Sequence, residues 1–113
     1  MAAIRIMQGD SYAIPITLTL NNAPLNPDMV AEIEICVGED VSIRKTFTAG
    51  TVYYDSAAQK WYIRPTQAET LAMDPGGYDV IARIKYRNEE LSDVKGLLIG
   101  RIIISDTYSN EVI

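Results

Sequence analysis

The sequence predicts an all-β fold, and two observations support this prediction. Isoleucine and valine together number 22, whereas leucine numbers only 7, and β-branched side chains pack better on the pleated surface of a strand than on a helix. Apolar and polar residues also alternate in several short segments that are separated by Gly, Pro and Asn turn signals. We therefore expect an antiparallel β-sandwich of about seven or eight strands, with one short helix near residues 67–73.

The first long strand is predicted over residues 12–20. Alternation places one set of side chains on a single face, which should join the core: Tyr12, Ile14, Ile16, Leu18 and Leu20. Pro15 has no N–H group to donate to a neighbouring strand, so this strand should lie at a sheet edge or carry a bulge.

Two further strands are predicted in the middle of the chain. Over residues 30–37, the inward face is formed by Ala31, Ile33, Ile35 and Val37. The opposite face carries Glu32, Glu34 and Cys36, and we expect both glutamates to be solvated. A weaker strand over residues 41–47 is interrupted by Lys45, which indicates a position at the edge of a sheet.

A hairpin and the helix follow. Residues 51–54 and 60–64 flank a loop of a length typical of hairpins. Thr66 and Glu69 form a Thr-x-x-Glu capping box, which predicts that a helix begins there. Pro75 and the glycines after it should end this helix within about two turns. The helical side chains expected to face the core are Ala68, Leu71 and Met73.

The last two strands are predicted over residues 78–86 and 97–104. On the first, the inward side chains should be Tyr78, Val80, Ala82, Ile84 and Tyr86. On the second, they should be Leu98, Gly100, Ile102 and Ile104, and the nearly continuous apolar run indicates burial on more than one side. The same parity leaves three isoleucines outward: Ile81, Ile99 and Ile103. Either other parts of the chain cover them or they form a subunit contact.

This number of short strands is typical of an immunoglobulin-like antiparallel β-sandwich. The sandwich would lack an inter-sheet disulfide because Cys36 is the single cysteine, which we expect to be a small packed side chain. No internal repeat, low-complexity tract or linker is visible, so we expect one domain over residues 1–113.

Composition argues against several classes of function. The formal net charge is −5, which opposes binding to nucleic acid or to an anionic membrane surface, and no apolar run approaches the length of a membrane span. The chain has no histidine, which removes the commonest general base and metal ligand. Neither a phosphate-binding loop nor a calcium-loop motif is present. We therefore expect no enzymatic activity and no cofactor or metal.

Aromatic side chains suggest one alternative function. Tyr53, Tyr54 and Tyr62 lie on the two strands of the predicted hairpin, and exposed aromatic side chains on a sheet can stack on sugar rings. Trp61 has the opposite parity to Tyr62 and should be in the core. A carbohydrate-binding or bacterial surface-adhesion domain, with the three tyrosines facing its ligand, is therefore the alternative to a protein-binding module.

Three segments resemble small immunoglobulin-like domains of tailed-bacteriophage structural proteins. Residues 8–12 (Gln-Gly-Asp-Ser-Tyr) are similar to the entry into their first strand. Residues 66–73, followed by Gly-Tyr-Asp-Val at 77–80, are similar to their helix and the strand after it, and residues 95–102 are similar to their closing strand. The resemblance is in particular to the N-terminal domain of baseplate upper proteins.

The resemblance implies a structural or assembly module of a phage or prophage. Such a module would act without catalysis, through protein–protein contacts in a tail or baseplate, and would belong to the virion after assembly in the host cytoplasm. The implied partners are other phage structural proteins, and a homo-oligomer remains open. The interface residues under this hypothesis are Ile81, Ile99 and Ile103.

Overall fold

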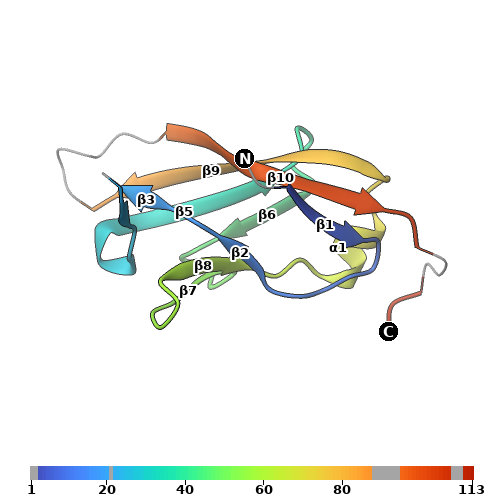
Figure 1. Cartoon of the computed structure of the whole chain (residues 1–113), viewed down its shortest axis with the longest axis horizontal. Helices are drawn as coiled ribbons and strands as arrows, with labels where there is room; N and C mark the ends of the chain where they lie inside the picture. The colour runs from blue at the N-terminus through green and yellow to red at the C-terminus, as the bar shows by residue number, and fades with distance from the viewer. Residues whose placement is uncertain (1–2, 21, 88–94, 108–110) are drawn as a thin grey trace.

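The computed structural model describes residues 3–20, 22–87, 95–107 and 111–113. It is mostly β, with several sheets and one short α-helix, α1 (Gln67–Leu71). This confirms the predicted all-β class. Figure 1 shows two layers of strands, with α1 at one end of the molecule.

The larger sheet has five strands. In spatial order they are β1 (Ala3–Met7), β10 (Lys95–Ser105), β9 (Gly76–Tyr86), β5 (Val30–Val37) and β6 (Ile43–Thr46). All neighbours are antiparallel except β1 and β10, which run parallel. The long strand β9 therefore lies at the centre of this sheet. The strand β6 lies at its edge, as the interruption of its apolar pattern by Lys45 predicted.

The smaller sheet has three strands. Their order is β2 (Ile14–Ile16), β8 (Lys60–Ile63) and β7 (Val52–Asp55), all antiparallel, and β7 and β8 form the predicted hairpin. The strands β3 (Thr19–Leu20) and β4 (Ala23–Pro24) form a separate two-stranded ladder, followed by a 3-10 turn over Pro27–Met29. Pro15 lies in β2, which is an edge strand of this sheet, as predicted.

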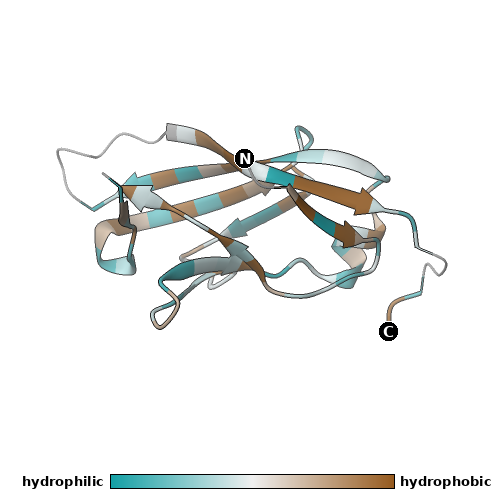
Figure 2. Cartoon of the chain, viewed as in Figure 1, coloured by the Kyte–Doolittle hydropathy of each residue, from teal (hydrophilic) through white to brown (hydrophobic). Residues whose placement is uncertain are grey.

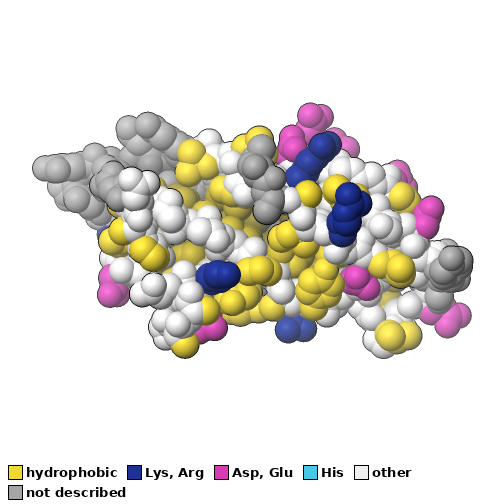
Figure 3. Space-filling view, in the orientation of Figure 1, with side chains coloured by type: hydrophobic (Ala, Val, Ile, Leu, Met, Phe, Trp, Pro, Cys, Tyr) yellow, Lys and Arg dark blue, Asp and Glu magenta, His cyan; other side chains and the backbone are white. Residues whose placement is uncertain are grey.

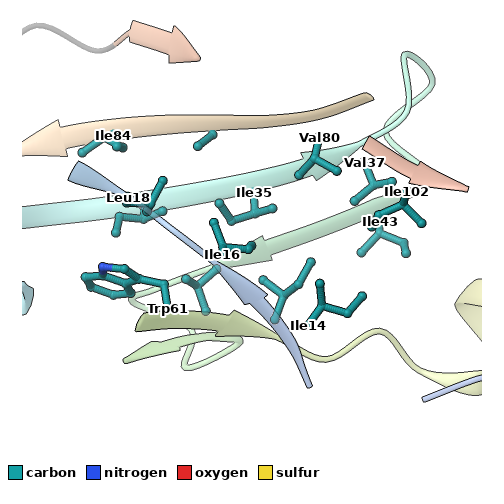
Figure 4. Packing of buried hydrophobic residues seen from close by; sticks show 14 of the residues in the cluster. Ile14, Ile16, Leu18, Ile35, Val37, Ile43, Trp61, Val80, Ile84 and Ile102 are labelled. Carbon is teal, nitrogen blue, oxygen red and sulfur yellow. The ribbon is translucent and has the colours of Figure 1, made fainter. Parts of the chain in front are cut away.

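A shared hydrophobic core lies between the two sheets. Trp61 on β8 and Ile14 and Ile16 on β2 belong to the same cluster as the inward side chains of β5, β9 and β10. Figure 4 shows these side chains meeting between the layers. In Figure 2 hydrophobic and hydrophilic residues alternate along β5 and β9, as expected for strands with one face in the core and the other toward solvent.

The first predicted strand is shorter than expected. Ile14, Ile16 and Leu18 are buried, but the chain forms two short strands there, β2 and β3, instead of one long strand. The prediction that Tyr12 faces the core is wrong: its side chain is 41% exposed, and its hydroxyl donates to the Arg5 carbonyl oxygen at 3.3 Å. Pairing with β8 stops at Ile14, so the alternation cannot extend to Tyr12.

The strand β5 has the predicted bounds and one local change of parity. Its register with β9 shifts between Val30 and Glu32, and both Val30 and Ile33 are buried while Ala31 is exposed. The prediction that Ala31 faces inward is therefore wrong, because the shift turns its side chain away from the core.

Lys45 on β6 is also buried, with its ammonium group 2.7 Å from Glu69 Oε1. Partial burial by itself raises the pKa of Glu69, but the hydrogen bonds from Lys45 and Thr66 lower it below its ordinary value. The charge that interrupts the apolar pattern of this strand thus connects β6 to α1.

The helix begins at the predicted capping box. The Glu69 amide donates to Thr66 Oγ1 at 3.1 Å, and the Thr66 amide donates to Glu69 Oε1 at 2.7 Å. The helix ends at Leu71, earlier than predicted, and Met73 beyond it is buried. Ala68 is exposed, which corrects the prediction that it faces the core; Thr70 is the buried side chain of this turn.

The strand β10 carries a second change of register. Its pairing with β9 shifts between Leu98 and Gly100. Ile102 and Ile104 are buried as predicted, but Leu98 is 46% exposed, so its predicted inward position is wrong. Leu97 is 44% exposed, which also corrects the expectation that the whole strand is buried on more than one side.

Candidate interaction surfaces

Three apolar side chains form a row across the outer face of the five-stranded sheet, the face turned away from the core. Ile81 on β9 is the register partner of Cys36 on β5 and of Leu98 on β10. Val37 and Val80, the strand neighbours of Cys36 and Ile81, are buried in the core, so the alternation turns Cys36 and Ile81 outward. Leu98 lies beside Ile81 in the register and is 46% exposed. We call Cys36, Ile81 and Leu98 the apolar row.

The structure separates the three isoleucines that the sequence grouped. Ile81 and Ile103 are half-buried on the outer face, as their parity predicted. Ile99 lies at the register shift of β10 and packs against the core, so its predicted outward position is wrong. Leu98 takes the exposed position instead, because the extra residue of the bulge reverses the parity before Gly100.

One end of the outer face is basic. Glu34 Oε2 accepts from Arg44 Nε at 2.6 Å, and Glu34 Oε1 accepts from Arg83 Nη1 at 3.2 Å. Both arginine side chains are more than half exposed, whereas that of Glu34 is 14% exposed. Two guanidinium groups share one carboxylate, which leaves this cluster with a net positive charge.

The ionisation of Glu34 agrees with this arrangement. Partial burial acts to raise the pKa of Glu34, whereas the hydrogen bond from Arg44 and the nearby guanidinium charges lower it. The net result is a pKa below the ordinary value, so Glu34 remains a carboxylate at neutral pH. The same partial burial and the neighbouring Glu34 raise the pKa of the Cys36 thiol, which favours its neutral form.

The other end of the outer face is acidic. Asp79 Oδ1 lies 3.7 Å from Arg101 Nε, and both side chains are more than half exposed. Glu39 and Asp40, in the turn between β5 and β6, are exposed beside them and border a hollow of about 290 Å³ together with Asp79 and Arg101. The loose contact at 3.7 Å leaves Asp79 with hydrogen-bonding capacity to spare.

Glu32 has a structural role that the sequence did not indicate. Its Oε1 accepts from the amides of Ile33, Phe47 and Thr48, and its Oε2 accepts from the Thr48 hydroxyl. Partial burial acts to raise the pKa of Glu32, but these hydrogen bonds together outweigh that effect. The pKa of Glu32 therefore lies below its ordinary value. The expectation that Glu32 and Glu34 are simply solvated is therefore wrong: both are half-buried and hydrogen-bonded.

The outer face of the three-stranded sheet presents an aromatic row. Tyr62 on β8 is the register partner of Pro15 on β2 and of Tyr53 on β7. The rings of Tyr53 and Tyr62 stack with centroids 5.7 Å apart and planes 19° apart. Beside them is an open hollow of about 430 Å³, which Ala13 and Asp55 also border.

Tyr54 does not belong to this aromatic row. Its ring lies 4.9 Å from Trp61 and packs against the core, on the opposite side of the sheet. The sequence grouped Tyr54 with Tyr53 and Tyr62, but consecutive residues of a strand point to opposite faces. Tyr53 and Tyr62 therefore stack on the outer face, whereas Tyr54 packs against Trp61 and still borders the hollow.

A third feature is an apolar groove between the open edges of the two sheets. It has a volume of about 280 Å³, and its lining includes Ile4 on β1, Ile14 and Ile16 on β2, and Ile99 on β10. Figure 3 shows hydrophobic side chains gathered along the middle of this side of the molecule. The bulge in β10 thus places Ile99 in the groove, whereas the sequence placed it on the outer face.

Searches for other kinds of site gave negative results. Among the described residues, no group of three or more His, Cys, Asp or Glu side chains is placed to hold a metal ion. No helix within the described ranges is both long enough and apolar enough to cross a membrane. Comparisons of the chain with protein-family models, with curated proteins and with solved structures found no match.

Proposed function

We propose that this chain is a non-enzymatic structural or assembly module of the tailed-bacteriophage type, which acts through protein–protein contacts in a tail or baseplate. The observation that carries the proposal is the apolar row on the outer face of the five-stranded sheet. The solvated face of an antiparallel sheet commonly carries polar side chains, so adjacent apolar positions in register on it favour a contact surface. Here Leu98 is 46% exposed beside Ile81, and charged clusters flank both.

We propose further that the fold is an immunoglobulin-like sandwich. In such folds one sheet has the strand order G-F-C-C′ and the other B-E-D. The order β10-β9-β5-β6 and the order β2-β8-β7 fit this scheme, with the parallel pair β1 and β10 added at one edge. The Tyr78 hydroxyl donates to the Asp74 carbonyl oxygen at 2.5 Å, and this contact resembles the tyrosine corner of the class.

The proposed mechanism is geometric. A rigid sheet presents an apolar centre between charged ends, which is the arrangement of a specific protein interface. Burial of the centre would supply most of the affinity, and the charged ends would select the partner and fix its orientation. The contact would form during assembly in the host cytoplasm and persist in the virion.

The composition of purified virions tests this proposal. Particles from a host that carries the gene are purified through a density gradient and analysed by mass spectrometry. We expect the chain in a fixed ratio to tail proteins, with less of it incorporated for Ile81→Arg. Tyr53→Ala, on the other sheet, is the matched control and should be incorporated normally. Virions without the chain, or normal incorporation of Ile81→Arg, would contradict the proposal.

The aromatic row supports a second candidate, a carbohydrate-binding or surface-adhesion domain. Tyr53 is 39% exposed and lies with Tyr62 beside the open hollow of the three-stranded sheet. However, the two rings stack on each other, so the ring faces between them are occupied. A sugar would therefore bind one outer ring face rather than lie across a flat platform.

A glycan array separates the second candidate from the first. We expect no binding under the structural proposal. If a glycan does bind, and Tyr62→Ala abolishes binding while Ile81→Arg does not, the aromatic row is the functional surface. This outcome would replace the assembly module with the binding domain.

A further inference from the structure

We propose that the outer face of the five-stranded sheet is self-complementary, and that a second copy of this chain docks on it face to face. The two-fold axis would follow the apolar row, at right angles to the strands. This inference deepens the proposed function and rests on it, because it names one partner of the same surface. It commits to a second copy and follows from the order of apolar and charged side chains along β9.

The apolar row supplies the centre of the contact. A residue on a two-fold axis meets its own counterpart in the second copy. With the axis along the apolar row, Ile81 would pack against Ile81 of the second copy, and Leu98 against Leu98. Three apolar positions in register on three adjacent strands would thereby be removed from water together.

Along β9, the charges on either side of the row then fall opposite their complements. Arg44 on β6 is the register partner of Cys36 and lies on the line of the row, but its side chain turns to Glu34. Asp79 and Arg83 each lie two residues from Ile81 along β9, in opposite directions, which places them about 7 Å to either side of the axis. Rotation about the row exchanges these two positions. Asp79 of each copy would therefore face Arg83 of the other, and the dimer would contain this pair twice.

Both groups have capacity for a new partner. Arg83 shares Glu34 with Arg44, whose contact is the shorter one at 2.6 Å against 3.2 Å. Asp79 lies 3.7 Å from Arg101, at the limit of an ion pair. A contact across the dimer would neutralise the excess positive charge at one end and the excess negative charge at the other.

The charges along β9 also favour a two-fold axis along the apolar row over a two-fold axis parallel to the strands. An axis parallel to the strands through β9 would place Asp79 against Asp79 and Arg83 against Arg83. Like charges placed opposite each other in an interface disfavour it strongly. The order Asp79, Ile81, Arg83 along β9 thus allows the orientation about the row and opposes the parallel one.

The face is large enough for a dimer contact. With about 4.8 Å between strands and about 3.4 Å per residue, β10, β9 and β5 over the span from Gly77 to Lys85 cover roughly 400 Å² of projected area, and the shorter strands β1 and β6 add roughly 100 Å². The accessible surface area of the face exceeds this projected area because side chains protrude from the sheet. The face therefore approaches the roughly 800 Å² per partner of a standard interface.

A charge-exchange experiment tests the inference. Sedimentation equilibrium of the unsubstituted chain should show a monomer–dimer equilibrium. Asp79→Arg alone and Arg83→Asp alone should each weaken the dimer more than about tenfold, because each places like charges opposite each other twice. An equimolar mixture of the two variants should dimerise again, since both contacts of the mixed dimer are then between opposite charges.

Two further variants act as controls. Ile81→Arg should abolish the dimer, whereas Tyr53→Ala, on the other sheet, should leave its dissociation constant unchanged. Circular dichroism checks that every variant is folded, and the mixture experiment works only with folded chains. Rescue in the mixture is an outcome that a general loss of stability could not produce.

The other outcomes overturn the inference in distinguishable ways. A strict monomer at millimolar concentration that is nevertheless incorporated into virions would assign this face to a different tail protein and leave the proposed function standing. A dimer that is insensitive to Ile81→Arg and to both charge variants would place the contact elsewhere. A monomer absent from virions would overturn the proposed function as well.

Discussion

The two sheets contribute different side chains to the core. The three-stranded sheet contributes Trp61 beside four aliphatic side chains (Ile14, Ile16, Val52 and Ile63), whereas the five-stranded sheet contributes many aliphatic side chains and no aromatic one of comparable burial. Trp61 on β8 is fully buried, its ring contacts Phe47 and Tyr54 at centroid distances of 5.3 and 4.9 Å, and its Nε1 donates to the Leu25 carbonyl oxygen at 2.9 Å. On the larger sheet, burial is spread over Ile, Val and Ala side chains of β5, β9 and β10.

This difference predicts where each sheet is sensitive to substitution. Loss of one methyl group among many aliphatic neighbours removes little buried area and leaves a small void. Loss of Trp61 removes the largest buried side chain and leaves the Leu25 carbonyl oxygen without its donor. The smaller sheet should therefore depend more on Trp61 than on any of its aliphatic side chains, and the larger sheet should tolerate the loss of single methyl groups.

Trp61→Ala should produce the largest loss of stability. We expect the free energy of unfolding to fall by about 3–5 kcal/mol, or the chain to fail to fold, because a large cavity forms between the sheets. Urea denaturation followed by circular dichroism measures the change. The conservative substitution Ile35→Val on the larger sheet removes a single methyl group and should cost about 0.5–1.5 kcal/mol. Equal losses for the two variants would contradict the comparison.

Glu69→Ala should have the next largest effect, because it disconnects the five-stranded sheet from α1. It leaves the Lys45 ammonium group buried without its carboxylate and removes half of the capping box. We expect a loss of about 2–3 kcal/mol in urea denaturation, below the full value for a buried pair because Glu69 is partly exposed.

Lys45→Met is the control for this pair. It removes the buried charge together with its need for a partner, while Glu69 keeps its hydrogen bond with the Thr66 amide. We therefore expect a smaller loss than for Glu69→Ala. A larger loss of stability for Lys45→Met than for Glu69→Ala would mean that the ion pair itself stabilises this contact. The helix cap and the cost of leaving the Lys45 charge unpaired would then be the smaller contributions.

Much of the fold could be predicted because residue alternation and short-range hydrogen bonding operate locally. The alternation over residues 78–86 correctly assigned Val80, Ala82 and Ile84 to the core, and the spacing of Thr66 and Glu69 correctly predicted the start of α1. Each of these features depends on residues a few positions apart, so the sequence alone contains the information.

The errors come from features that depend on a neighbouring strand. A bulge adds a residue to one strand relative to its partner, which reverses the parity on one side of it. Such register shifts displaced Ala31 on β5, and Leu98 and Ile99 on β10. Gly100 gave a local signal, since an isolated glycine within a strand often marks a bulge. Nothing local marked the shift at Ala31.

The candidate surface was therefore predicted only in part. Parity alone was enough to place Ile81 and Ile103 on the outer face, and the same rule failed for Ile99. Parity also placed Cys36 on the outer face, but the apolar row itself, with Leu98 in it, could not be predicted because it exists only through the pairing of three strands. The pairs that Glu34 forms with Arg44 and Arg83 likewise connect different strands.

Acid should destabilise the chain through three carboxylates, two on the five-stranded sheet and one on α1. The pKa values of Glu32, Glu34 and Glu69 lie below the ordinary value of 4.5 in the folded chain. Their contribution to stability is therefore fully present above the unfolded pKa and is lost as the pH falls through the folded values. We expect the midpoint of urea unfolding to decrease steadily below about pH 4.5.

Glu32→Gln tests the origin of this pH dependence. The amide oxygen can still accept hydrogen bonds from Phe47 and Thr48 but does not titrate, so the variant should lose less stability than the unsubstituted chain between neutral pH and acid. If the dependence of stability on pH is the same in Glu32→Gln as in the unsubstituted chain, the low pKa of Glu32 is not its source.

The smallest effect is expected for Arg101→Gln on the outer face. Its contact with Asp79 spans 3.7 Å between side chains that are both more than half exposed. Exposed ion pairs of this kind contribute between nothing and about 1 kcal/mol, because water screens the charges and ordering long side chains costs entropy. We expect urea denaturation of dilute protein to detect a change below about 0.5 kcal/mol.

A larger loss would mean that Arg101 stabilises the fold by packing over Gly77, where its guanidinium lies within 2.9 Å of the position a Cβ atom would occupy. Gly77→Ala then provides the check, since it displaces the guanidinium while leaving its charge in place.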